Sequence, residues 1–169
     1  MMIRRSPWYL WTLLLVWLGN SWSLSLPAQP YLAHVTYYGI EQGLSHRTIY
    51  DVHQDQRGFI WMATEYGLNR FDGQTFRTWT QASDGLQRQK QHHLLEDGQG
   101  YLWSFCLAVW RFQRDVKTID LVNIYTGEVI TPEARFGAQW TWTTQDILSF
   151  ADDEQGRVTL SLRDGRLVH

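Results

Sequence analysis

Residues 43–76 read GLSHRTIYDVHQDQRGFIWMATEYGLNRFDGQTF, a stretch in which four short apolar runs are separated by three turn signals. Part of the stretch returns with a fixed spacing of 42 residues, as from position 43 to position 85. A period of about 40 to 45 residues, with four strands in each unit, is typical of β-propeller blades. The matching pairs are Gly43 and Gly85, Leu44 and Leu86, Asp55 and Asp97, Gly58 and Gly100, and Trp61 and Trp103.

The repeating unit is predicted to contain four strands, at 48–54, 59–64, 68–71 and 75–80. The first is rich in β-branched and aromatic residues and ends at Asp55-Gln56-Arg57-Gly58, a sequence suited to a tight turn. The second, FIWMAT, is apolar on both faces and must therefore be covered on both sides. The dipeptide Asp72-Gly73 is a strong hairpin signal before the fourth strand. The sequence thus predicts an all-β fold of four-stranded antiparallel meanders that pack face to face, as propeller-type blades do.

The second copy is less regular than the first. Its strands are expected at 92–96 and 101–109, followed by a strand pair within 116–129 around Tyr125-Thr126-Gly127. Ala108-Val109-Trp110 takes the place of the turn Tyr66-Gly67-Leu68, and Arg111-Phe112 follows Arg70-Phe71 by one position less than the period. We therefore expect one residue to have been lost before that pair.

The third copy begins near Asp146, with strands expected at 147–151 and 157–162 on either side of Asp153-x-x-Gly156. The period would place this Asp and Gly at positions 139 and 142, so the second copy carries an extension. Thr159 stands where the first two copies have tryptophan. The sequence therefore predicts an incomplete propeller of about two and a half blades. Closed propellers have about four to eight blades, so we expect the chain to be a fragment of a longer protein or the product of a truncated reading frame.

The predicted organisation has five parts. Residues 1–25 resemble an export signal, with Arg4 and Arg5 before an apolar run, Trp8 to Leu18, which is short for a membrane span. An uncleaved signal anchor is the alternative, and either one sends the rest of the chain across the membrane. Residues 26–42 form a linker with a lone strand, HVTYY at 34–38, which either completes a distant blade or remains a free arm. Blade 1 is expected at 43–84, blade 2 with an extension at 85–144, and a partial blade 3 at 145–169.

Composition and charge exclude several classes of function. The formal net charge is −2, and beyond the first five residues there is no dense cluster of Lys and Arg, which argues against a nucleic-acid partner. Cys106 is the only cysteine, so no intrachain disulfide or cysteine-based zinc site is expected. His92 and His93 would point to opposite faces of a strand and could not easily share a metal ion. We predict no metal site, no cofactor and no catalytic residue.

The candidate site residues are mainly those of the repeat motif. In Asp55-x-x-Gly58-x-x-Trp61 the Asp and the Gly suit a turn and the Trp suits the space between blades, so a structural role is favoured over contact with a ligand. Trp140 and Trp142 alternate on an expected strand and either stack on a sugar ring or, as we favour, pack against the next blade. The full set of motif residues is Gly43, Leu44, Asp55, Gly58, Trp61, Gly67, Leu68, Asp97, Gly100, Trp103, Asp153 and Gly156.

The first copy resembles the two-component regulator propeller repeat. That repeat combines a Gly-Leu-Ser opening, an Asp-x-x-Gly-x-x-Trp centre and a Gly-Leu-x-Arg-Phe-Asp close, which here are 43–45, 55–61 and 67–72. The resemblance holds for 97–103 and weakens afterwards. It implies a place in a large propeller on the periplasmic side of a hybrid sensor histidine kinase, in a family commonly tied to sensing of glycan breakdown products.

We therefore expect part of an exported, periplasmic, ligand-sensing propeller without catalytic activity of its own. The resemblance implies an oligosaccharide ligand bound through the full-length propeller, and further blades and a kinase module as partners. A homodimer that covers the open edges is another expected partner, and the N-terminal segment is a candidate inner-membrane tether. The alternatives are a secreted propeller enzyme, a glycosidase or lyase that would need paired carboxylates, and a propeller scaffold that binds protein.

Overall fold

The computed structural model of the protein describes residues 35–110, 113–153 and 155–169. The strands and helices named below belong to one compact unit, Tyr37–His169. The expected export signal at 1–25 lies outside the described residues, as does most of the expected linker.

The first sheet contains four antiparallel strands in the order β1-β2-β3-β4. Their bounds are Ile49–Gln54 for β1, Ile60–Thr64 for β2, Gly67–Phe71 for β3 and Phe76–Trp79 for β4. The predicted bounds of all four strands agree within one residue at each end. As predicted from its two apolar faces, β2 is the most buried strand of the sheet, and Trp61 and Ala63 have no exposed surface.

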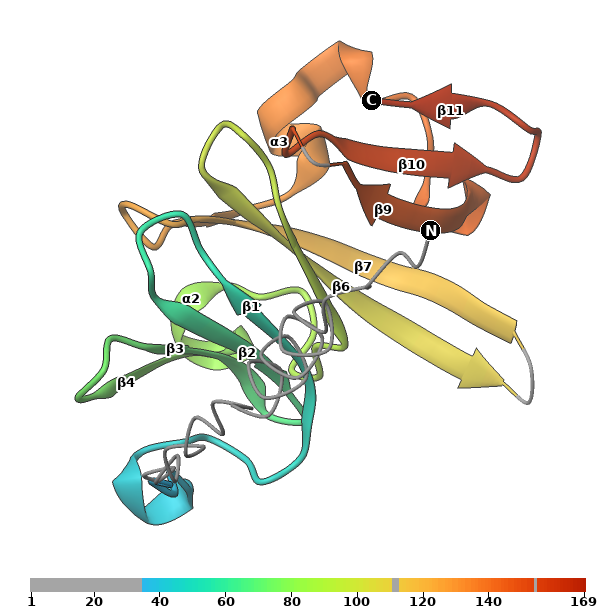
Figure 1. Cartoon of the computed structure of the whole chain (residues 1–169). Coiled ribbons are helices and arrows are strands. Elements are labelled where there is room, and N and C mark those ends of the chain that lie inside the picture. The colour runs from blue at the N-terminus through green and yellow to red at the C-terminus, as the bar shows by residue number, and fades with distance from the viewer. Residues whose placement is uncertain (1–34, 111–112, 154) are drawn as a thin grey trace, which may run out of the picture. The chain divides into compact units, whose positions relative to one another are not determined.

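Two further sheets follow in the chain, the second with the order β5-β6-β7-β8 and the third with the order β11-β10-β9. Figure 1 shows the first in green, the second mainly in yellow and the third in red. The fold class predicted from the repeat, blades of antiparallel strands, is therefore confirmed. The strands are β5 His93–Glu96, β6 Tyr101–Trp110, β7 Gln113–Asn123, β8 Val129–Ile130, β9 Ile147–Asp152, β10 Val158–Leu162 and β11 Leu167–Val168.

One short helix, η1, precedes the first sheet, and the others connect the sheets. α2 begins after Thr80, whose hydroxyl accepts a hydrogen bond from the backbone N–H of Ser83. α3 begins in the same way after Thr131, with Pro132 at its first position, where a missing N–H costs nothing. The bounds are η1 Ile40–Gln42, α2 Gln81–Asp84, α3 Pro132–Phe136, η2 Gly137–Gln139 and η3 Thr144–Asp146.

Two apolar cores lie between the sheets. Alternate residues of the second sheet face opposite ways, so that Leu94 and Leu102 join the first core while Leu95 and Trp103 join the second. The first core also contains Trp61 and Trp79 of the first sheet. Each pair of neighbouring sheets is thus held by its own cluster of buried side chains, as in stacked propeller blades.

The prediction that the second copy has lost a residue is wrong. Trp103 on β6 pairs with Leu121, whereas the equivalent Trp61 on β2 pairs with Arg70, much nearer in the sequence. The β6–β7 hairpin is therefore nine residues longer than β2–β3, and 108–110 belongs to strand β6 rather than to a turn. Figure 1 shows this hairpin reaching well past the other strands of its sheet. The longer hairpin accounts for most of the extra residues that separate the third copy from the second.

Two other expected strands do not form. Val35 to Tyr38 has no regular structure, and the Tyr38 ring packs on Phe71 at 4.6 Å between ring centroids, so no strand is seen in the described part of HVTYY. Trp140-Thr141-Trp142 lies in an irregular segment between η2 and η3. The alternation of its residues suggested a strand, but Pro132 and the capping Thr131 start a helix just before it.

Candidate functional site

The repeat motif in the first sheet is organised by the carboxylate of Asp55. Its Oδ1 accepts hydrogen bonds from the backbone N–H groups of Arg57 and Phe59, both at 2.9 Å. Its Oδ2 accepts from the indole N–H of Trp61 at 2.7 Å. Asp55 is 3% exposed and Trp61 is fully buried. The motif therefore joins the surface turn to the core through a single side chain.

The second copy repeats this geometry with one addition. Asp97 Oδ1 accepts from the backbone N–H groups of Gln99 and Tyr101, and its Oδ2 accepts from the Trp103 indole N–H at 3.0 Å. Arg135 of α3 also donates to Asp97 Oδ2, at 2.7 Å, and its guanidinium lies 3.8 Å from the centroid of the Tyr101 ring. The segment inserted after β8 is thus tied to the repeat turn.

The third copy keeps the turn without the tryptophan. Asp153 Oδ1 accepts from the backbone N–H groups of Gln155 and Arg157, and Arg157 Nε takes the place of the indole on Oδ2 at 2.7 Å. These bonds, the backbone one from Arg157 first, hold the pKa of Asp153 below its ordinary value. Thr159 donates or accepts a hydrogen bond with His169 at 2.9 Å. The Asp–Gly turn therefore forms whether or not an indole is present.

The other motif residues lie at turns or in the cores. Gly58, Gly100 and Gly156 occupy the three Asp turns with positive φ, and the Gly156 carbonyl accepts a hydrogen bond from the Gly98 N–H of the neighbouring turn at 2.7 Å. Leu44 and Leu68 are buried. Gly43 follows η1, and Gly67 opens β3. The structural role that the sequence favours for these residues stays a prediction.

Trp140 and Trp142 lie together, with ring centroids 5.5 Å apart, and both pack against the second core. Trp140 stands 6.3 Å from Trp103, in an arrangement like that of Trp79 and Trp61 at 4.8 Å. Both rings also line a cavity of about 420 Å³ that Arg135 and Arg157 border. Their buried indole N–H groups have no partner among the described residues. The arrangement agrees with packing, and stacking on a ligand stays a prediction.

A second cavity, of about 710 Å³, lies where the first strands of the three sheets begin. β1, β5 and β9 lie beside one another there, and the backbone N–H of Leu94 bonds Asp51 of β1 at 2.9 Å. The lining residues are Tyr50, Lys90, His92, His93, Leu107, Val116, Leu148, Ser149 and Phe150. This cavity was not predicted from the sequence. Tyr50, His92 and Leu148 hold equivalent positions in the three copies of the repeat, but their residue types differ, so the sequence shows no motif there.

Hydrogen bonds fix most of the polar groups in this second cavity. Lys90 Nζ lies 2.8 Å from Glu65 Oε2, to which the Tyr50 hydroxyl also donates. These bonds, the one from Lys90 first, lower the pKa of Glu65. The backbone N–H of Leu107 donates to Nδ1 of His92 at 2.9 Å, and burial, followed by the charge of Lys90, lowers the pKa of that imidazole. His92 is therefore neutral near pH 7, with its proton on Nε2.

His93, by contrast, faces Asp51, with Nδ1 and Oδ2 2.5 Å apart, and its ring lies 5.1 Å from that of Phe150. The two neighbouring histidines thus have different partners. Among residues 35–110, 113–153 and 155–169, no group of three or more His, Cys, Asp or Glu side chains could hold a metal ion.

Comparisons with known proteins agree with the geometry. The family model described as two component regulator propeller matches residues 43–66, which cover the opening of the repeat, the Asp55 turn and β2. Residues 43–66 are a two component regulator propeller repeat. A histidine kinase of Formosa agariphila is 46% identical to the chain over 37 residues. Those residues are 22% of the chain and 3% of the kinase.

A solved structure extends this propeller likeness beyond the matched repeat. It is the extracellular domain of a protein assigned as a hybrid two component system, BT3049 from B. thetaiotaomicron, with a TM-score of 0.53 and 25% sequence identity. The match covers 79% of the present chain and 20% of that domain. The chain thus spans about a fifth of the propeller-containing domain it resembles. Within the described residues, no helix has the length and apolar character needed to cross a membrane.

Proposed function

We propose that this chain supplies blades to the extracellular sensor propeller of a hybrid two-component system and has no catalytic activity of its own. The observation that carries the proposal is the repeat itself, matched at residues 43–66 and built in the structure as blades of antiparallel strands. The similarity to the extracellular domain from B. thetaiotaomicron supports the same place outside the cell. An oligosaccharide is the ligand that the resemblance to the family implies.

The arrangement of the motif side chains supports a binding role over catalysis. The Asp55 and Asp97 carboxylates are occupied by backbone amides and by indole N–H groups, so neither is free to act as an acid or a base. A glycosidase would need two carboxyl groups about 5 to 10 Å apart across a shared cleft. The second cavity instead brings together aromatic, imidazole and paired charged groups, which suit recognition.

The first test concerns export. Fusion of alkaline phosphatase after His169, in the intact chain with its N-terminal segment, should give an active enzyme in a Gram-negative host, because the phosphatase folds only outside the cytoplasm. A fusion that begins at residue 26 serves as the control and should be inactive. Activity that does not depend on residues 1–25 would contradict an export role for that segment.

The second test concerns signalling. The transcript that encodes the chain in its natural host should be read beyond the codon for His169 in every frame. Further Asp-x-x-Gly-x-x-Trp repeats, a membrane span and a kinase would support the proposal, and the kinase and remaining blades would then be its partners. A stop codon followed by unrelated sequence, with no co-transcribed kinase, would overturn it.

A further inference from the structure

The second cavity lies between repeat-equivalent positions of three consecutive sheets. Tyr50 of β1 and His92 just before β5 are separated by the period of the repeat. Leu148 of β9 follows His92 by the same spacing that separates Asp153 from Asp97, so it holds the equivalent place in the third copy. The Tyr50 and His92 rings lie 4.8 Å apart. One residue from each sheet therefore contributes to one cavity of about 710 Å³.

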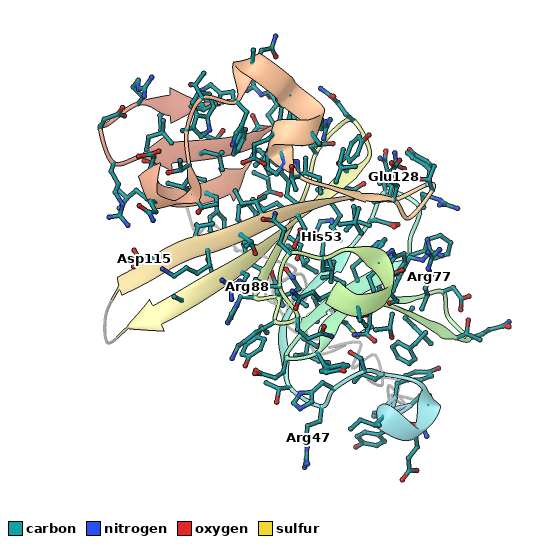
Figure 2. All side chains as sticks on the ribbon, turned by 180° about the vertical axis from the view of Figure 1, so that it is seen from behind. Arg47, His53, Arg77, Arg88, Asp115 and Glu128 are labelled. Atoms are coloured by element: carbon teal, nitrogen blue, oxygen red, sulfur yellow. The ribbon has the colours of Figure 1, made fainter. Side chains whose placement is uncertain are left out.

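The extended β6–β7 hairpin supplies the remaining wall through Leu107 and Val116. The first sheet has no counterpart, because its hairpin is nine residues shorter. Two interactions hold this wall in position. Leu107 N–H bonds His92, and Asp115, labelled on β7 in Figure 2, forms an ion pair with Arg163 of the β10–β11 turn at 2.7 Å. The cavity is thus preformed, which favours binding because little ordering is needed.

The lining of the cavity combines aromatic and aliphatic side chains with polar ones, namely Lys90, His92, His93 and Ser149. Tyr50 is 40% exposed and Leu148 is 55% exposed, so both have surface to offer to a ring. Lys90 and Glu65 neutralise each other, and Asp51 is engaged by His93 and by the backbone of Leu94. The Nε2–H of His92 is left as a neutral donor. A site whose charges are already paired discriminates against a charged ligand, because binding would have to break one of those pairs.

We propose that this cavity binds an uncharged ring compound that carries hydroxyl groups, such as a neutral sugar residue. The ring stacks on Tyr50 and Leu148, and one of its oxygens accepts the hydrogen bond of His92 Nε2. This inference rests on the proposed sensor function and deepens it: it places the ligand at the first strands of three consecutive sheets and makes the ligand neutral. The extended hairpin is then part of the binding site rather than an incidental insertion.

The test is a titration of the full chain with named probes. Neutral disaccharides, namely maltose, cellobiose, lactose and xylobiose, are compared with glucuronic and galacturonic acids by saturation-transfer NMR and calorimetry. At least one neutral probe should bind, and Tyr50→Ala should weaken it by about tenfold or more, as expected when an aromatic platform is lost. Tyr50→Phe should retain most of the affinity, because it keeps the ring and loses only the hydroxyl that bonds Glu65 and Lys90.

The matched control is Tyr37→Ala, since Tyr37 is 86% exposed and lies outside the cavity. Circular dichroism of each variant shows whether it remains folded. The inference is overturned if no neutral probe binds, if the acids alone bind, or if Tyr50→Ala and Tyr37→Ala have equal effects. Failure of the sensor proposal is a separate result, because it shows in the transcript and not in the titration.

Discussion

At the scale of single residues, Asn69 and Asp120 occupy the same place in neighbouring repeats and differ only in the group that ends the side chain. Asn69 pairs with Met62 in the first sheet, and Asp120 pairs with Ser104, one repeat period after Met62, in the second. Each accepts a hydrogen bond through Oδ1 from the backbone before its sheet, at 3.0 Å from Ser45 and 3.1 Å from Gln87. Both side chains are fully buried. The neutral amide of Asn69 can therefore be buried at this position without a charge, whereas the ionised carboxylate of Asp120 brings a negative charge into the interior.

Replacement of Asp120 by Asn should stabilise the protein at neutral pH. Burial raises the pKa of Asp120 from 3.8 to about 6, only partly offset by hydrogen bonds from Gln87 and Gln91. An acid with a raised folded pKa stabilises the fold fully below its unfolded pKa and loses that contribution as pH rises through the folded pKa. Asp120→Asn should therefore gain about 3 kcal/mol well above pH 6 and little near pH 4, as measured by urea unfolding.

The reverse exchange, Asn69→Asp, is the control for that experiment. It should introduce the same pH dependence into the first sheet and destabilise the protein increasingly between about pH 4 and 7. If the free energy of unfolding of Asp120→Asn differs from that of the unmodified chain by the same amount at every pH, the raised pKa of Asp120 is contradicted.

The buried carboxylate of Asp55 allows a second prediction. In Asp55→Asn, the amide can keep the two backbone bonds only by turning its NH₂ group toward the Trp61 indole N–H, so that two donors meet. This buried loss should cost about 3 kcal/mol in the free energy of unfolding. Asp153→Asn is the matched control, because its turn is the same but its second partner is the exposed Arg157, and its cost should be much smaller because solvent screens that pair. Equal losses would show that the indole bond contributes nothing.

At the scale of elements, the β2–β3 hairpin shows how closely the sheets' connections are fitted. Gly67 has φ of +95°, and a Cβ atom there would lie 2.1 Å from the carbonyl oxygen of Trp79 on β4. Its N–H donates to the Gln89 carbonyl at 2.7 Å. The absence of a side chain at Gly67 thus lets β3, β4 and the segment before β5 come together at one point. The β2–β3 hairpin therefore cannot move without disturbing β4 and that segment.

Gly67→Ala should therefore destabilise the protein much more than Gly73→Ala. Gly73, in the β3–β4 turn, has a similar φ of +99°, but no atom lies within 4 Å of the place that a Cβ would occupy. Alanine at Gly73 should cost about 1 to 2 kcal/mol for its left-handed backbone alone, and alanine at Gly67 should add the cost of displacing Trp79. Thermal unfolding of both variants measures the difference, and equal shifts in Tm would disprove the close approach.

The strands of the first sheet could be predicted because β-branched runs, Asp–Gly turns and a two-faced apolar strand all point the same way. The β6–β7 hairpin could not, because its extra residues are themselves strand-like and contain no glycine to mark the turn. Trp140-Thr141-Trp142 alternates as a strand would, yet tertiary packing on Trp103 decides its shape. The cavity at Tyr50 and His92 depends on which strands become neighbours, and a local pattern cannot report that.

At the scale of the whole described unit, neighbouring sheets are joined by side chains that cross between them. The Trp79 indole N–H on β4 donates to the carbonyl oxygen of Gly127 in the β7–β8 turn at 2.8 Å. Arg57 of the first sheet similarly donates to the Ile124 carbonyl at 2.9 Å. Between the second and third sheets the backbone turns bond directly, from Gly98 to Gly156. The blades are therefore expected to unfold cooperatively.

Trp79→Phe and Trp140→Phe should show how differently the two sheet interfaces depend on a buried indole N–H. Phenylalanine at 79 leaves the Gly127 carbonyl without its buried donor and should cost about 2 kcal/mol or more. Phenylalanine at 140 removes an indole N–H that has no partner among the described residues, so its cost should be limited to the lost ring volume. Chemical denaturation followed by circular dichroism gives both values, and a larger loss for Trp140→Phe would refute this ranking.

The single carboxylate shared by a surface turn and a core indole also governs how the turn opens. The amide protons of Arg57 and Phe59 sit in a solvent-facing loop, where hydrogen exchange is ordinarily fast. Because Asp55 holds them together with the Trp61 indole proton, they should exchange only when the core strand also loosens. All three protons should thus share one protection factor, and an exposed turn would report the opening of the blade interior.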